Sequence, residues 1–180
     1  MAESDETTED PARALLTDGF GRIHDLVGRV TSGAGGDVLA HRVDPGANTV
    51  AWLVWHLTRV QDTHVADLAG FEPVWSTEGW CERFNLSLDA GDTGYGATTA
   101  DVAALDGVTT EQLTGYHEAV NAMTERYLAT IDGEELGRIV DRGWDPPVTA
   151  SARLVSVISD CLQHLGQAAF IRGAAERTAT

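Results

Sequence analysis

Residues 160–167 read DCLQHLGQ, and this stretch places Asp160 and His164 four positions apart in a pattern typical of an amphipathic helix. On a helix the two side chains share one face, with their Cβ atoms about 5–6 Å apart. A carboxylate and an imidazole at that spacing can bind the same divalent metal ion. Open transition-metal sites take about three protein ligands and keep a position for water or substrate. A third ligand must come from elsewhere in the chain, and the candidate is His56.

Apolar residues recur at steps of three and four in four segments of the chain, which predicts four amphipathic helices. The first begins at Pro11, which suits the first turn of a helix. The second follows Asn48, a residue type favoured at the N-cap. The third follows Thr109, which with Gln112 matches a capping box. The predicted helices span about residues 11–30, 49–69, 109–131 and 149–176.

Four amphipathic helices in one chain predict the all-α class and a four-helix bundle, with a long crossover between the second and third helices. The crossover, residues 70–108, has little helical periodicity and carries several aromatic side chains. We expect those aromatics to anchor it to the bundle and the segment to cover the mouth of a site. The later connection, residues 134–148, is predicted to be a loop. Bundles place metal sites on facing helices, which is what His56 opposite Asp160 and His164 requires.

The composition limits the domain organisation and the compartment. The chain has 180 residues, 43% of them hydrophobic, which fits one domain with a sizeable core. We expect residues 1–10 to be a disordered acidic tail and residues 11–177 to be the bundle domain. No run of about 18 apolar residues and no basic leader are present, so we expect a soluble, cytoplasmic protein. Cys81 and Cys161 are expected to be reduced thiols.

The charge of the chain excludes some functions. A net charge of -16 disfavours nucleic acids and anionic lipid surfaces as partners, which leaves small molecules. All 12 basic residues are arginines, so a Schiff base on lysine is excluded.

The surroundings of His56 favour a metal ligand, although other roles remain open. Trp52 and Trp55 flank it, and an apolar setting favours the neutral imidazole that binds metals. A lone inward histidine is also often a satisfied core residue, and Asp160 has the alternative of accepting a hydrogen bond from His56 or His164. His64 lies two turns further on, rotated by roughly 80°, and is a poorer partner for the site.

Other histidines and Cys161 give weaker signals. Cys161 points about 100° away from Asp160 around the helix, so we interpret it as a small core residue and not as a nucleophile. His24, His41 and His117 are scattered over other segments, where surface or core roles are expected.

Two stretches together resemble the DinB-like superfamily, in particular its thiol-dependent branch. They are residues 48–57, NTVAWLVWHL, and residues 160–167, in the order and spacing of that family's two signatures. The resemblance implies a four-helix bundle that binds a divalent metal ion through His56, Asp160 and His164. Relatives in this branch are the metal-binding domain of mycothiol-dependent maleylpyruvate isomerase and the mycothiol or bacillithiol S-transferases.

The sequence departs from the family pattern at three points. Asp160 stands where Glu or His is commoner, so the metal ion would lie nearer the fourth helix or be bound more weakly. Ala97 stands where similar sequences have a histidine. The chain ends just past the fourth helix, without a counterpart of the isomerase's additional domain, and we therefore expect a stand-alone transferase.

The expected activity follows from the resemblance. A divalent ion, for which zinc is the first choice and nickel, manganese or iron are alternatives, would activate a mycothiol-type thiol that attacks an electrophile. The alternatives are a metal-dependent hydrolase and a non-catalytic metal-binding or stress-related bundle protein. Arg59 is a candidate for orienting an anionic group, although a solvated surface arginine is an equal alternative. The full set of substrate-binding candidates is Arg59, Trp52, Trp80 and Arg83, and a homodimer is expected from family similarity.

Overall fold

The structure is a computed structural model in which residues 10–178 are described. The predicted acidic tail, except for Asp10, lies outside the described residues. Within them the chain is mostly helical, with nine helices and one two-stranded sheet. The predicted all-α class is therefore confirmed in its main feature.

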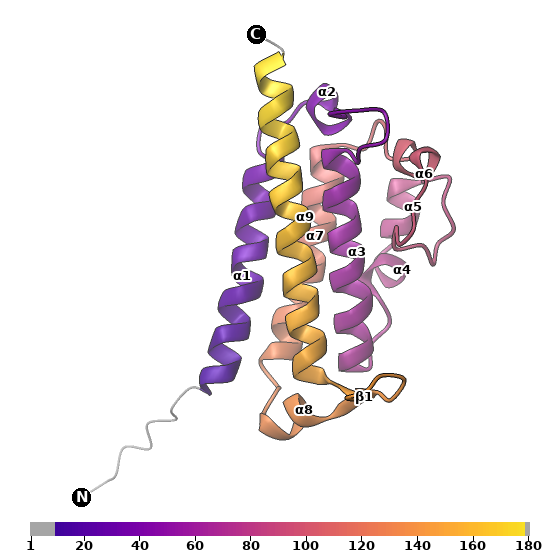
Figure 1. The fold of residues 1–180 in the computed structure, drawn as a ribbon. Coiled ribbons are helices and arrows are strands. Elements are labelled where there is room, and N and C mark those ends of the chain that lie inside the picture. The colour runs from indigo at the N-terminus through magenta and orange to yellow at the C-terminus, as the bar shows by residue number, and fades with distance from the viewer. Residues whose placement is uncertain (1–9, 179–180) are drawn as a thin grey trace, which may run out of the picture.

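Four long helices form the body of the molecule (Figure 1). Helix α3 packs against α7 and α9, and α1 packs against the same two helices, so that each long helix has two long neighbours. Residues far apart in the sequence thereby share one core. The four are α1 (Pro11–Thr31), α3 (Val50–Ala69), α7 (Thr110–Leu128) and α9 (Ala150–Thr178).

Side-chain caps fix where the long helices begin. The carboxylate of Asp10 accepts from the amide of Ala12, and Pro11 occupies the first helical position. At α7 the predicted capping box of Thr109 and Gln112 is present in both directions. The predicted N-cap of the second helix is wrong by one residue, because Thr49 and not Asn48 caps α3.

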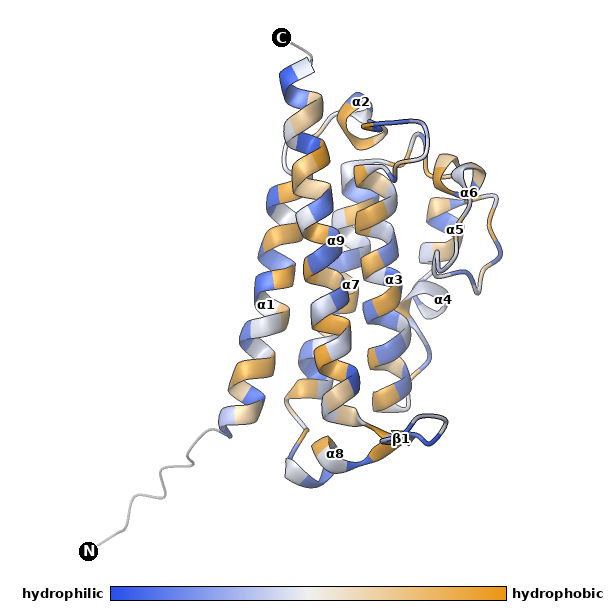
Figure 2. Cartoon of the chain, in the orientation of Figure 1, coloured by the Kyte–Doolittle hydropathy of each residue, from blue (hydrophilic) through white to orange (hydrophobic). Residues whose placement is uncertain are grey.

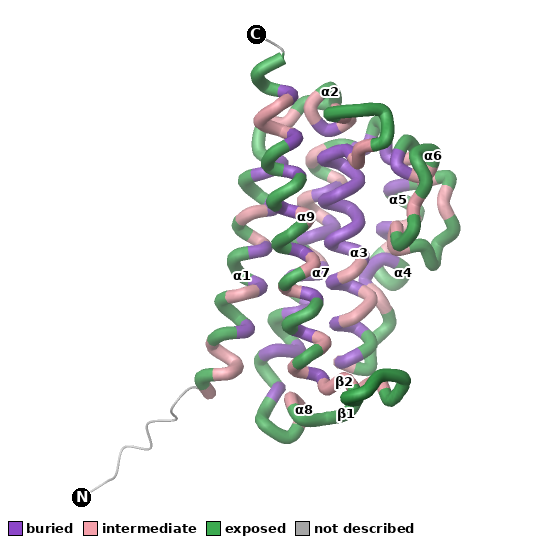
Figure 3. The backbone as a smooth tube through the Cα atoms, viewed as in Figure 1, coloured by how far each residue is buried: buried purple, intermediate pink, exposed green. Residues whose placement is uncertain are grey.

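Helix α3 is the central element. As an amphipathic helix it was expected to bury one stripe of residues, but it buries residues on most of its sides. Almost all of its residues are buried, polar ones included, whereas α1 and α9 alternate between buried and exposed faces (Figure 3). The reason is that α7, α9 and the crossover together surround it. In the hydropathy colouring, hydrophilic and hydrophobic residues alternate along α3 as they do along α1 and α9 (Figure 2), so α3 buries hydrophilic residues as well.

The crossover contains three short helices that were not predicted, α4 (Val74–Thr77), α5 (Trp80–Phe84) and α6 (Thr99–Ala103). They are too short for a periodic apolar pattern to show in the sequence. Buried aromatic side chains from α4 and α5 pack into the core, as the anchoring interpretation predicted.

The remaining connections also contain short elements. Helix α2 (Gly36–Leu39) follows α1. The predicted loop at 134–148 instead contains α8 (Gly133–Gly137) and the antiparallel strands β1 (Ile139–Asp141) and β2 (Val148–Thr149), which lead into α9. The third long helix ends at Leu128 and not near residue 131, because α8 has its own N-cap at Asp132.

Helix α9 is, among the described residues, the one helix long and apolar enough by length and composition to cross a membrane. Core helices of soluble proteins pass the same test. In this structure α9 buries its apolar stripe against α3 and α1, which accounts for its composition.

Candidate metal site

The packing of α9 on α3 brings the three predicted ligands together. His56 comes from α3, and Asp160 and His164 come from α9. One donor atom from each lies within 4.8 Å of the other two. His56 is buried, while the two α9 residues are half-buried at the edge of the interface.

The His56 ring is held on two sides. Trp52 stacks on its face with a centroid distance of 4.6 Å and an interplanar angle of 14°. Its Nδ1 lies 2.5 Å from the carbonyl oxygen of Thr93. A carbonyl only accepts, so Nδ1 carries the hydrogen and Nε2 keeps its lone pair. Burial lowers the pKa of His56, which favours the neutral ring, although the Thr93 hydrogen bond acts in the opposite direction.

Gly94 permits this contact between the crossover and His56. Its φ of +90° lies in the left-handed region, and a Cβ built there would stand 2.8 Å from Nδ1 of His56 and 3.1 Å from the rings of Trp52 and Trp55. Only glycine fits such a position. The sequence does not predict that Gly94 or Thr93 belongs to the site, because their proximity to His56 depends on the path of the crossover.

Asp160 and His164 form a pair on α9. Nε2 of His164 lies 3.5 Å from Oδ1 of Asp160, and Nδ1 of His164 lies 3.3 Å from Oε1 of Gln167. The interaction with His164 lowers the pKa of Asp160, and the same interaction raises the pKa of His164. The second oxygen of Asp160, Oδ2, is buried and has no hydrogen-bond partner.

These observations fit a divalent cation. Two imidazoles and one carboxylate are a donor set that zinc and several other first-row ions accept. The unpartnered Oδ2 of Asp160 is an acceptor that a cation would satisfy. A histidine ligand whose other nitrogen donates to a backbone carbonyl, as His56 does to Thr93, is the usual arrangement at metal sites.

A cavity of about 600 Å³ opens from His56 and Asp160 toward solvent. Its rim includes two exposed aromatic side chains, Tyr95 of the crossover and Trp144 of the β1–β2 connection. Because Thr93 and Tyr95 border this cavity, the crossover does reach over the site, as predicted.

Arg153 and His64 supply the polar wall of this cavity. Nη1 of Arg153 lies 3.0 Å from Nδ1 of His64, and another of its nitrogens lies 3.5 Å from a carboxylate oxygen of Asp141. Arginine only donates, so Nδ1 of His64 accepts and its Nε2 carries a hydrogen. Arg153 was not predicted, because its partners His64 and Asp141 lie on other elements and meet it only through the packing of the chain.

Arg59 is buried and does not line the cavity. Its Nε donates to the carbonyl of Asp92 at 3.1 Å, its guanidinium lies 5.0 Å from the ring centre of Trp75, and Nη1 lies 3.7 Å from the carboxylate of Asp62. The prediction that it orients an anionic substrate therefore gains no support from its position. Arg59 instead links α3 to the crossover by its hydrogen bond to Asp92, the residue before Thr93.

The other substrate-binding candidates lie in two places. Trp52 is at the site, stacked on His56. Trp80 is buried in α5, where it packs on Gly115 and carries Arg83 over its ring at 4.4 Å. Neither Trp80 nor Arg83 lines the cavity beside His56.

Cys161 is a core residue. It is fully buried, and its thiol lies 3.6 Å from the carbonyl of Leu57 on α3. Burial raises the pKa of this thiol, which makes it a poor nucleophile.

Comparison with known proteins shows what the sequence and the fold are similar to. The sequence profile of the mycothiol S-transferases matches residues 22–176. A crystal structure of a conserved protein from Enterococcus faecalis is similar, with a TM-score of 0.82 and 30% sequence identity over 88% of this chain and 94% of that chain. None of the curated proteins compared matches this chain.

Proposed function

The chain belongs to the mycothiol S-transferase family, a member of the DinB-like superfamily, and we propose that it transfers a mycothiol-type thiol to an electrophile with the help of a divalent metal ion. The observation that carries the metal dependence is the meeting of His56, Asp160 and His164, the first two of which also line the cavity. A divalent cation held by these three residues would supply the positive charge that lowers the pKa of a thiol substrate, which would favour its ionised form at neutral pH.

The protein residues have separate roles in this proposal. His56 and His164 present Nε2, because the Nδ1 atom of each faces an oxygen that fixes the ring. Asp160 would supply the negatively charged ligand, through a carboxylate whose Oδ2 has no hydrogen-bond partner. The reaction forms a carbon–sulfur bond while the leaving group departs with its electron pair, and the thiol proton passes to solvent through the open cavity.

Substrate binding is assigned to the cavity wall. Arg153 and the Nε2–H of His64 are donors beside the site, suited to a carboxylate or another anionic group of the thiol or the electrophile. The exposed rings of Tyr95 and Trp144 offer apolar surface to the organic part of the electrophile.

The proposal extends to the helix bundle, the bounds of the domain, the compartment and the identity of the metal ion. We assign α1, α3, α7 and α9 to a DinB-like four-helix bundle spanning residues 11–177 as one domain, in a soluble cytoplasmic protein. Zinc is the first choice of metal ion for two histidines and a carboxylate, with nickel, manganese and iron as alternatives.

A thiol-transfer assay on the metal-reconstituted full chain tests the activity. We expect conjugation of an activated aryl halide to mycothiol above the uncatalysed rate, dependent on added metal ion. The variant His164→Ala should lose metal and at least about 100-fold in rate, because an open site with two protein ligands binds poorly. The matched control is His41→Ala, a histidine that does not line the cavity beside His56.

The outcomes separate the alternatives. Turnover of ester or amide substrates without thiol would replace the transferase by a metal-dependent hydrolase, since the same open position activates water. Absence of stoichiometric metal from both the wild type and His164→Ala after reconstitution would contradict the metal site and favour a non-catalytic bundle protein.

A further inference from the structure

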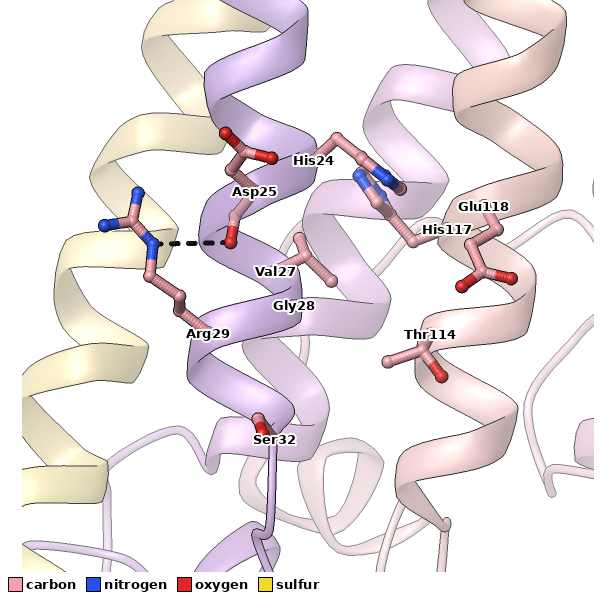
Figure 4. A pocket seen from close by; sticks show the side chains of 9 residues that line it. All are labelled: His24, Asp25, Val27, Gly28, Arg29, Ser32, Thr114, His117 and Glu118. Carbon is pink, nitrogen blue, oxygen red and sulfur yellow. Dashed lines mark hydrogen bonds between the residues drawn. The ribbon is translucent and has the colours of Figure 1, made fainter.

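Helices α1 and α7 enclose a second cavity, of about 350 Å³, that none of His56, Asp160 and His164 lines. Figure 4 shows the ring of His24, from α1, facing the ring of His117, from α7, across this cavity. The ring centroids are 5.7 Å apart and the planes differ by 16°.

The tautomer of His117 follows from its one hydrogen-bond partner. The hydroxyl of Thr58 donates its hydrogen to the carbonyl of Val54 at 2.8 Å. Its oxygen must therefore accept from Nδ1 of His117, which lies 3.2 Å away. Nε2 of His117 is left with a lone pair, and this atom is buried without a hydrogen-bond partner in a residue that is only 1% exposed.

His24, on α1, also has an unpartnered ring nitrogen. Its Nδ1 is also buried without a hydrogen-bond partner. Both residues line one cavity, and a group that accepts an electron pair from each of these two unpartnered nitrogens would satisfy both.

The surroundings favour a cation as that group. The carboxylates of Asp25 and Glu118 also line the cavity, and the whole chain carries a net charge of -16. Arg29 lines it as well, but its Nε lies 3.4 Å from the carbonyl of Asp25 on its own helix. Burial lowers the pKa of His117 to about 3, so the ring is neutral and able to ligate at physiological pH.

We propose that His24 and His117 form a second metal site, which takes an imidazole-binding transition-metal ion such as zinc and links α1 to α7. Among the described residues no third side chain completes a cluster with them. Water therefore fills the remaining positions, and the affinity is lower than at the site of His56, Asp160 and His164. Because the two ligands come from different helices, the bound ion stabilises the folded chain by mass action.

Metal stoichiometry of the full chain tests this proposal. Protein stripped with a chelator is titrated with Zn²⁺, and with Co²⁺ for absorption spectra, and bound metal is measured after gel filtration. We expect two ions per wild-type chain, one in His24→Ala, one in His164→Ala and none in the double variant. His41→Ala, which changes a histidine lining neither cavity, should retain two.

A stability measurement gives an independent readout. In the His164→Ala background, Zn²⁺ should raise the melting temperature, and adding His24→Ala should abolish that rise. His24 is only partly buried, so its truncation leaves the metal-free fold intact, as circular dichroism will verify.

Two outcomes overturn the proposal: saturation of the wild type at a single ion that His164→Ala removes, or a second ion that persists in His24→Ala. The converse pattern, a single ion lost in His24→Ala and kept in His164→Ala, would support this site and contradict the one proposed for thiol transfer.

Discussion

At Gly94 the backbone of the crossover passes close to the rings of His56, Trp52 and Trp55. A Cβ at this position would overlap Nδ1 of His56, whereas at Gly96, which also has a positive φ, it would meet nothing within 4 Å. An alanine would be strained by the positive φ at either position, but only at Gly94 would it also collide with the site. Comparing the two alanine variants therefore distinguishes the cost of crowding from the cost of backbone strain.

We predict that Gly94→Ala destabilises the protein by roughly 1–3 kcal/mol more than Gly96→Ala, because the neighbouring rings must shift. The displaced Thr93 carbonyl would also weaken metal binding about 10–100-fold. Urea unfolding and metal titration of both variants check this. Equal effects of the two substitutions would show that the close approach to His56 is unimportant.

His117 makes the stability of the metal-free protein depend on pH. Its pKa is about 3 in the folded chain, against 6.5 for an unperturbed histidine, so between these pH values the unfolded chain binds the extra proton. Stability is full above about pH 6.5 and falls as the pH drops toward 3. The slope for one proton is about 1.4 kcal/mol per pH unit.

We predict that His117→Gln removes this slope from the pH dependence of the unfolding free energy, measured with a chelator present. His24, Asp25 and Glu118 face the same cavity and remain in both proteins. A slope between pH 6.5 and 4 that is unchanged in the variant would mean that His117 is protonated in the folded chain.

At the scale of elements, Asp62 joins α3 to the crossover. Its carboxylate is fully buried and accepts hydrogen bonds from the amides of Val74 and Trp75 and from the hydroxyl of Tyr116. The hydrogen bond from Arg59 to Asp92 continues this attachment toward Thr93. The position of the His56 ring therefore depends on the attachment of a segment more than 30 residues away in the sequence.

We predict that Asp62→Asn destabilises the protein by about 3–5 kcal/mol, because it leaves the buried charge of Arg59 without its partner. The matched control is Asp67→Asn, an exposed position on the same helix, with an expected change below about 0.5 kcal/mol. Denaturant unfolding measures both. Similar values for the two variants would contradict the structural role of Asp62.

At the scale of the whole molecule, α9 has an apolar stripe on its exposed side. Val155, Leu162 and Phe170 are exposed, and their spacing puts them within about 80° of one another around the helix. This stripe lies opposite the buried face of α9 and away from Asp160 and His164. We propose it as the surface of the homodimer expected from the family.

We predict that Phe170→Glu converts a dimer into a monomer in light scattering, while metal content stays the same. Val43→Glu, which changes an exposed apolar residue in the loop after α2, should leave the dimer intact. A dimer that persists in Phe170→Glu at micromolar concentration would exclude this surface.

The sequence by itself determined the four long helices and the pairing of Asp160 with His164, because periodicity and caps such as Thr109 with Gln112 act within a few residues. It also identified His56 as the partner from α3, through its family resemblance and its place in an apolar pattern. The short helices of the crossover stayed hidden, because their stability comes from buried aromatic contacts with the core and not from local repeats.

Only the tertiary structure decided which polar side chains meet. From the sequence, Arg59 could orient an anionic group or lie solvated on the surface, yet the crossover buries it. Arg153 and His64 come together through the packing of α9 on α3. Thr93 orients His56, and His24 faces His117 across α1 and α7. These contacts join residues 37 to 93 positions apart, and such distances are set by how the helices pack and not by the pattern along any one of them.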